Sequence, residues 1–205
     1  MKTVVMILYL VLLLAANESR AENLSLAGRH FLVVFAYEGP GNRAVDSHVF
    51  ASVWTGDNLE VGNAAPPATI SWLPTRLYLP ALRRWQGRNF SLSETLDWAR
   101  RNGYRVGAHG PYEISGDLYQ RFLAQIRFLD SGAVSYKMIN GPFSRGAVNC
   151  INAVGDVLGR TRTGTTWGMG AARGIVSHLS PHIVGYPESH TYVGELVGLR
   201  ALLSR

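Results

Sequence analysis

The chain has 205 residues, a formal net charge of +6 at pH 7 and a single cysteine, with 47% hydrophobic and 17% charged residues. This composition argues against intrinsic disorder and excludes an intramolecular disulfide framework, and the length suits one domain with a substantial core. Arg83-Arg84 and Arg100-Arg101 are the only adjacent basic pairs, and neither lies among interleaved aromatics. A nucleic-acid groove is therefore not predicted, while anionic cell-surface polymers stay open as partners.

Residues 1–21 are typical of a secretory signal peptide. Lys2 supplies a positive charge, residues 4–16 are apolar apart from Tyr9, and Ser19-Arg20-Ala21 has a small-x-small cleavage pattern. The apolar run is shorter than the roughly 20 residues that a bilayer requires. We expect cleavage after Ala21, or as a second choice after Ala16. The mature protein would then be secreted or periplasmic with no transmembrane segment, or membrane-anchored if the signal is retained.

Three strands are predicted in the first part of the remaining chain. Runs rich in β-branched and aromatic residues cover residues 29–37, 47–54 and 68–73, and each is followed by residues typical of turns. Because the three runs lie close in the sequence, an antiparallel meander is the simplest arrangement. Residues 77–85 fit either a short helix or an irregular edge.

Helices dominate the second part. Ser91 and Glu94 have capping-box spacing, and Ser115 is a plausible cap for a later helix. The hydrophobic periodicity predicts four helices, over residues 91–101, 116–129, 150–158 and 168–179.

Two more strands are predicted between these helices, over residues 104–109 and 134–139, and Gly110-Pro111 is expected to end the first. The sequence contains no internal repeat and no low-complexity linker. Residues 22–205 are therefore expected to form a single α+β domain with an antiparallel sheet and several packed helices.

Two residues carry the functional signal. Cys150 begins a predicted helix, where unpaired backbone N–H groups and the helix dipole lower the pKa of a thiol and can line an oxyanion hole. His48 lies in a strand among apolar residues, and an imidazole beside a thiol can activate it and then protonate the leaving group. Taken singly, each residue is more commonly structural. In combination they favour a Cys-His pair.

The order of these residues resembles that of circularly permuted papain-like proteins, the group that contains lecithin retinol acyltransferase-like and permuted NlpC-type enzymes. The matching segments are Ser47-His48-Val49-Phe50-Ala51, Thr69-Ile70-Ser71-Trp72 and Asn149-Cys150-Ile151-Asn152-Ala153-Val154, and the likeness covers roughly residues 30–160. The resemblance implies a permuted papain-like arrangement with Cys150 as nucleophile and His48 as its base. It also implies a peptide, cell-wall or lipid-ester substrate and no cofactor.

The sequence departs from the family pattern at two positions. The strand after His48, where the third, orienting residue of the family falls, offers only hydroxyl side chains in place of histidine, asparagine or a carboxylate. We take Ser71 as that residue because its hydroxyl can accept a hydrogen bond from the imidazole, with His109 or Asp46 as alternatives. Asn152 stands where the acyltransferase-like members carry histidine, which fits either an altered substrate or an inactive enzyme.

Other catalytic and ligand sites have weaker signals. His178 and His182 have the spacing of two metal ligands on one helix face, with His190 nearby, but Pro181 would disrupt that helix. The glycine-rich residues 164–170 lack the lysine of a phosphate loop, and no Gly-x-Ser-x-Gly elbow occurs. We therefore predict no metal site and no cofactor.

Two functions stay open. The first is an extracytoplasmic cysteine-dependent hydrolase or acyltransferase that attacks an amide or ester through Cys150. The second is a non-catalytic secreted binding or structural domain of the same fold, in which Cys150 is packed. Trp54, Trp72 and Trp85, if exposed, would then be candidates for contacting a glycan or a protein, although core packing is the role that we favour for them. The reactivity of the single thiol distinguishes the two.

Overall fold

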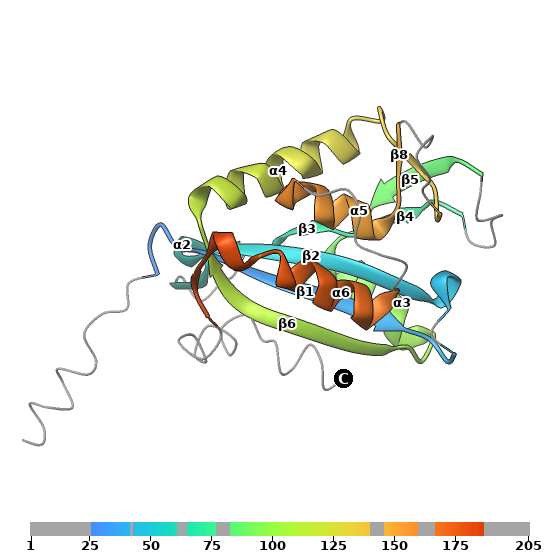
Figure 1. Ribbon diagram of the computed structural model, residues 1–205, viewed down its shortest axis with the longest axis horizontal. Helices are drawn as coiled ribbons and strands as arrows, with labels where there is room; N and C mark the ends of the chain where they lie inside the picture. Colours follow the sequence, from blue (N-terminus) through green and yellow to red (C-terminus); the bar gives the residue numbers. More distant parts are fainter. Residues whose placement is uncertain are drawn as a thin grey trace, which may run out of the picture.

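The computed structural model describes residues 26–41, 43–60, 65–76, 83–139, 146–159 and 167–186. The predicted signal peptide and His190 lie outside these described residues. Two sheets and a set of helices make up the described chain (Figure 1). The predicted α+β class with an antiparallel sheet is confirmed at this coarse level. None of the described helices is both long and apolar enough to cross a bilayer.

The larger sheet has five strands in the order β3-β2-β1-β6-β9, and every neighbouring pair is antiparallel. Its first three strands form the predicted meander. The strands are β1 (His30–Glu38), β2 (Ser47–Thr55), β3 (Ala68–Ile70), β6 (Arg105–Ile114) and β9 (Ile183–Gly185).

The smaller sheet has four short strands in the order β4-β5-β7-β8, with β7 and β8 parallel. The predicted strand over residues 68–73 in fact divides at Ser71, so that its first half pairs in the larger sheet and its second half in the smaller one. The four strands are β4 (Trp72–Pro74), β5 (Trp85–Asn89), β7 (Ser135–Tyr136) and β8 (Ala147–Val148).

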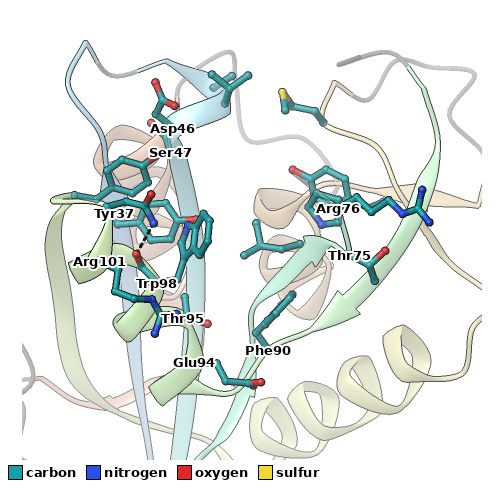
Figure 2. A pocket seen from close by; sticks show the side chains of 18 of the residues that line it. Tyr37, Asp46, Ser47, Thr75, Arg76, Phe90, Glu94, Thr95, Trp98 and Arg101 are labelled. Carbon is teal, nitrogen blue, oxygen red and sulfur yellow. Dashed lines mark hydrogen bonds between the residues drawn. The ribbon is translucent and has the colours of Figure 1, made fainter. Parts of the chain in front are cut away.

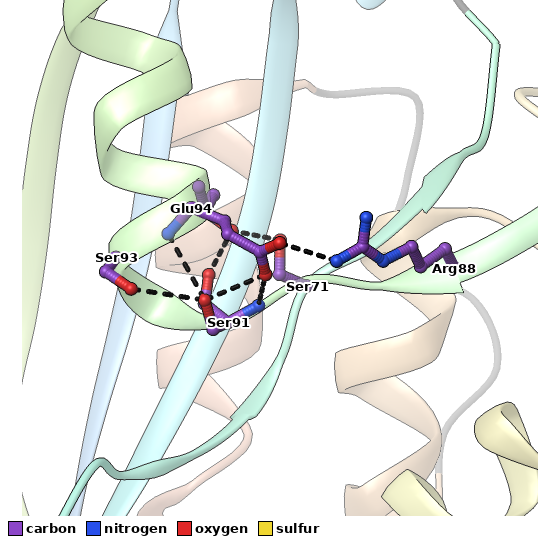
Figure 3. A network of polar contacts seen from close by, with 6 residues as sticks. Ser71, Arg88, Ser91, Ser93 and Glu94 are labelled. Atoms are coloured by element: carbon purple, nitrogen blue, oxygen red, sulfur yellow. Dashed lines mark hydrogen bonds and ion pairs between the residues drawn. The ribbon is translucent and has the colours of Figure 1, made fainter.

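The helices cover both faces of the larger sheet. In Figure 1, α6 lies in front of β1 and β2, α5 lies alongside β2 next to α4, and α3 lies behind the sheet. The four predicted helices are present, and the Ser91 and Glu94 capping box of α3 is confirmed (Figure 3). The α-helices are α2 (Gly56–Glu60), α3 (Leu92–Arg101), α4 (Gly116–Asp130), α5 (Cys150–Gly155) and α6 (Gly168–Ser177), and the 3-10 turns are η1 (Ala44–Asp46), η2 (Asp156–Leu158) and η3 (Ser180–His182).

Several predicted boundaries are wrong. Strand β6 runs through Gly110-Pro111, because a register shift opposite residues 32–34 and a positive φ of 117° at Gly110 absorb the break. The predicted strand over residues 134–139 shrinks to the two residues of β7, and the predicted helix over 150–158 changes to a 3-10 turn after Gly155. Strand β5 was not predicted, because its residues Trp85–Asn89 lack a run of β-branched side chains.

Side chains from β1 and β2 alternate between two hydrophobic cores. Leu32, Val34 and Val49 pack with α4, α5 and α6 in the first core, which also includes Trp72 and Tyr136 of the smaller sheet. The second core lies between the other face and α3. Its buried members are Leu26, Phe31, Val33, Phe35, Tyr37, Phe50, Trp54, Leu59, Leu92, Leu96 and Ala99. The central strands are thus buried on both faces.

The start of α6 is tied to the end of β1 by Glu38. The carboxylate of Glu38 is 7% exposed, accepts a hydrogen bond of 2.6 Å from the backbone N–H of Met169, and forms an ion pair with Arg105. Gly168, which directly precedes Met169, has a φ of +52°. A Cβ at this position would lie 2.6 Å from Oε1 of Glu38. Both the backbone conformation and the space therefore require glycine here.

We predict that Gly168→Ala lowers the free energy of unfolding by about 1–3 kcal/mol, because alanine is strained at positive φ and displaces Glu38. The matched control is Gly174→Ala in the same helix, where an added Cβ has no neighbour within 4 Å. It should leave stability unchanged or raise it by about 0.5–1 kcal/mol through helix propensity. Urea unfolding of the two variants measures both effects, and equal stabilities would contradict the role assigned to Gly168.

Candidate functional site

His48 is a buried histidine with one paired and one unpaired ring nitrogen. It lies near the start of β2, is 1% exposed, and packs against the rings of Tyr37 and Phe50. Its Nε2 atom lies 2.9 Å from the hydroxyl oxygen of Ser71. Its Nδ1 atom is buried and has no hydrogen-bond partner. The imidazole is therefore held from one side only.

Ser71 is fixed by bonds from three directions. Its backbone N–H donates to Oδ1 of Asn89 at 2.7 Å, and its carbonyl oxygen accepts from the N–H of Phe90 at 2.9 Å. Its hydroxyl lies 2.7 Å from Oγ1 of Thr95 as well as within reach of His48. Ser71 has no exposed surface, so its position between β3 and β4 is set by the protein alone. Figure 3 shows its side chain directed toward the start of α3.

Cys150 is the first residue of α5 and faces the backbone of β2. Asn149 caps the helix by accepting from the N–H of Asn152 at 2.8 Å, and its side-chain amide donates to the carbonyl of Met138. The backbone N–H of Val49, next to His48, is directed at the thiol. Cys150 is 5% exposed and belongs to the first core, whereas His48 packs with residues of the second. The two side chains thus meet β2 at adjacent residues, without a hydrogen bond between them.

The protonation states differ from those expected of an activated thiol. Burial raises the pKa of the Cys150 thiol to about 11, although the N–H groups of Val49, Ile151 and Cys150 act in the opposite direction. Burial also lowers the pKa of the His48 imidazole to about 3. Both groups are consequently neutral at pH 7. The N–H groups at the helix start act on the thiol pKa in the predicted direction, but desolvation outweighs them, so the expected net lowering is not found.

A cleft of about 840 Å³ is lined by neighbours of these residues, such as Tyr37, Ser47 and Thr95, but not by His48, Ser71 or Cys150 themselves. Figure 2 shows Tyr37, Ser47 and Trp98 along one wall and Arg76 and Phe90 along the other. One wall comes from η1, the start of β2 and α3, and the other comes from β4, β5 and β7. Two further lining residues connect the cleft to the site. Thr95 hydrogen-bonds Ser71. Tyr136 has a pKa that is raised, first by burial and second by the nearby Cys150.

His109 and Asp46, the alternatives to Ser71 as the residue that orients His48, lie elsewhere. His109 is half-buried on β6 opposite Val34, and its pKa is lowered by burial and by Arg173. Asp46 lies in η1 at the cleft and is paired with Arg43. Of the three candidates, Ser71 is the one that contacts His48, and its catalytic role stays a prediction.

The other candidate site residues are two histidines considered as metal ligands and three tryptophans considered as a binding surface. His178 hydrogen-bonds the carbonyl of Gly174, and His182 contacts Arg121. Within the described residues no group of three or more potential metal ligands occurs. Trp54 and Trp72 are buried in the cores, in agreement with the preferred prediction of core packing, whereas Trp85 is half-buried and lines the cleft.

Two residues of this site were missed by the sequence analysis. Asn89 clamps the crossing at Ser71 by donating to the carbonyl of Thr69 and accepting from Ser71. Thr95 adds a buried hydroxyl behind Ser71. A threonine inside the first turn of a capped helix offered only a weak signal, because its partner lies 24 residues earlier in the chain.

Comparison of the chain with protein-family models, with curated proteins and with solved structures finds no match in any of the three. The candidate site is therefore argued from its own geometry.

We predict that His48 makes the folded protein sensitive to acid. Because burial lowers its folded pKa to about 3 while an unfolded histidine titrates near 6.5, only the unfolded state gains this proton between those values. Stability should therefore fall as the pH drops from about 6.5 toward 3, with a slope of up to about 1.4 kcal/mol per pH unit from this group.

His48→Gln removes the titration while keeping a side chain that can hydrogen-bond Ser71. Urea unfolding at pH 7, 5 and 4 should show a smaller loss of stability in the variant than in the parent protein. His30 and His109, whose pKa values are also lowered by burial, are present in both proteins and cancel in the comparison. An identical pH dependence for the two proteins would show that His48 does not stay neutral in the fold.

Proposed function

We propose that this protein is a cysteine-dependent hydrolase or acyltransferase that cleaves an amide or ester bond, with Cys150 as nucleophile, His48 as general base and Ser71 as the orienting residue. The proposal includes a permuted papain-like arrangement of these three residues. The observation that carries it is the half-paired imidazole of His48. One ring nitrogen is anchored to Ser71, while the other is buried and unpaired beside the segment that faces the thiol.

An unpaired buried polar atom costs about 1–3 kcal/mol, so native proteins retain few of them. His30 also has a buried, unpaired Nδ1 atom, so this feature supports a general base at His48 only together with its position beside Val49, which faces the thiol. In a general base the free nitrogen is required, because it must accept a proton during the reaction. The orienting contact to Ser71 leaves Nδ1 as the free atom.

The chemistry proceeds in two stages. Sγ of Cys150 attacks the carbonyl carbon as its proton passes to Nδ1 of His48, and His48 then returns that proton to the leaving amine or alcohol as the C–N or C–O bond breaks. Water, or a second nucleophile in a transferase, attacks the resulting thioester and gives its proton to His48. Breakdown of that second intermediate releases the acyl product and restores the thiol. No cofactor takes part in this scheme.

The cleft suits a substrate with an apolar portion. Aromatic side chains from both walls line it together with as many charged ones, and the aromatic ones include Trp85, Phe90, Trp98, Tyr104 and Tyr136. Peptides with apolar side chains, cell-wall peptides and lipid esters all fit this description. The thiol and the imidazole pack against different cores and make no hydrogen bond to each other, so the proposed proton transfer requires one of the two side chains to move when a substrate enters.

We predict that the purified protein hydrolyses p-nitrophenyl esters or amides through a covalent intermediate on its only cysteine. Cys150→Ala should abolish both turnover and the acyl adduct seen by mass spectrometry, and His48→Gln should lower kcat by about 10²–10⁴-fold. His109→Gln is the matched control, since His109 lies on β6 opposite Val34, whereas His48 is the histidine that hydrogen-bonds Ser71. Thermal melts verify that each variant is folded. Turnover that persists in Cys150→Ala would overturn the assignment.

A second candidate is a binding domain that uses the same cleft without catalysis. It is favoured by the burial of Cys150 and by the thiol pKa of about 11. In that case iodoacetamide would label Cys150 only in denaturant, and peptides or lipid esters would change tryptophan fluorescence without being cleaved. Accumulation of an acyl-thioester on the folded protein excludes this candidate.

We also propose that the protein acts outside the cytoplasm, on the basis of the pattern in residues 1–21. N-terminal sequencing of protein recovered from the periplasm or medium should give Glu22 as the first residue, or Asn17 if the second cleavage site is used. A cytoplasmic protein that retains Met1 would contradict export.

A further inference from the structure

The excess positive charge of the chain is concentrated in the smaller sheet. The four strands of this sheet lie within residues 72–90 and 131–149, which together contain six basic residues and no acidic one. Since the whole chain has 20 basic and 14 acidic residues, the rest of it has 14 of each. The two segments therefore account for the entire net charge of +6.

The described part of these segments places most of this charge at the surface. The four described arginines are exposed, and the lysine is half-buried; these five residues are Arg76, Arg83, Arg84, Arg88 and Lys137. Arg88 forms an ion pair of 2.5 Å with Glu94 of α3, and the guanidinium carbon of Arg83 lies 5.8 Å from the centre of the Trp85 ring. A surface with so strong an excess of one charge attracts anions.

A cavity of about 600 Å³ lies along β5. Arg84, Gln86 and Arg88 line it at steps of two residues, which corresponds to roughly 6–7 Å along an extended chain. Among the described residues that line this cavity, Asp130 is the only carboxylate, and burial raises its pKa. The cavity thus presents two guanidinium groups in series to an anionic ligand.

This cavity is a neighbour of the cleft at the candidate site. Thr75 and Trp85 line both of them, and Figure 2 shows Thr75 beside Arg76 on one wall of the cleft. An elongated ligand with several anionic groups fits this arrangement better than a single small anion does.

The uncharged residues of the cavity indicate the class of anion. Thr75, Gln86 and Ser135 provide hydroxyl and amide groups, which can pair with the hydroxyls of a sugar. The half-buried ring of Trp85 provides an aromatic surface for the apolar face of a sugar ring. Guanidinium groups match carboxylates in shape and charge. A plain phosphate polymer would use the arginines alone.

We propose that the cavity along β5 is a binding site for an acidic polysaccharide, with Arg84 and Arg88 facing its carboxylates and Trp85 against a sugar ring. This site is separate from the proposed chemistry of Cys150 and does not depend on it.

Alginate oligosaccharides are a suitable probe because every sugar carries a carboxylate, and cello-oligosaccharides of the same length are the neutral comparison. Isothermal titration calorimetry of the purified protein should show binding of alginate that weakens as salt is added. Cello-oligosaccharides should bind at least about tenfold more weakly, since they lack the charge-assisted hydrogen bonds.

Arg84→Gln should weaken alginate binding by about tenfold, and Trp85→Ala should weaken it by about two- to tenfold. Arg84 is preferred to Arg88 for this test because Arg88 also pairs with Glu94 in the first turn of α3. The matched control is Arg173→Gln, which removes the same charge from the exposed side of α6. It should change the affinity by less than about twofold.

The proposal is overturned if alginate does not bind, if the neutral oligosaccharides bind equally well, or if the Arg84 and Arg173 variants have equal effects. Binding of long-chain inorganic polyphosphate as tight as that of alginate would reject the polysaccharide class. Thermal melts identify a variant that fails to fold, and the comparison of the three ligands on the parent protein still decides the outcome. Cys150→Ala should bind alginate as the parent does, so loss of the proposed catalytic function and loss of this site are distinguishable.

Discussion

The crossing of the chain from one sheet to the other at Ser71 determines how the candidate site is built. Strand β3 ends just before this residue and β4 begins just after it, so a single buried residue joins the five-stranded and four-stranded sheets. Asn89 and Phe90 hold its backbone, which leaves its hydroxyl for His48 and Thr95. The walls of the cleft come from the elements on either side of the crossing, and for this reason the hydrogen-bonded group of His48, Ser71 and Thr95 lies next to the cleft.

Burial of the central strands on both faces gives this crossing a rigid support. Side chains of β1 and β2 alternate between two cores, so a shift of register by one residue would exchange every buried contact between the faces. His48 and Val49 are part of this alternation. His48 packs with Tyr37 and Phe50, whereas Val49 belongs to the same core as Cys150. The separation of the thiol and the imidazole between two cores is therefore a consequence of the strand geometry.

The sequence predicted the features that depend on local signals. Ser91 and Glu94 marked the start of α3, Asn149-Cys150 marked the start of α5, and the strand around His48 was found from its β-branched run. Features that depend on distant partners escaped prediction. Strand β5 is stabilised by pairing with β4 and β7 rather than by propensity, and Gly110 continues β6 because β1 accommodates its bulge. The contact of Ser71 with His48 was anticipated from the resemblance, whereas Thr95 required the packing of α3.

The pKa of the thiol shows why a helix start is not a sufficient sign of an activated cysteine. Three backbone N–H groups favour the thiolate of Cys150, yet exclusion of water raises its pKa to about 11. Direct proton transfer to an imidazole with a pKa of about 3 would then cost roughly 11 kcal/mol in the closed site. That cost is more than half of the roughly 16 kcal/mol barrier that permits a turnover of about 10 per second.

A substrate must therefore change the environment of the pair if the protein is an enzyme. Entry of a carbonyl group beside Cys150 allows the proton to leave as negative charge passes from sulfur to the carbonyl oxygen, so a free thiolate is never formed. The imidazolium formed in the same step gains a negative neighbour that raises its pKa. On this scheme the reactivity of the neutral pair depends on what the cleft binds.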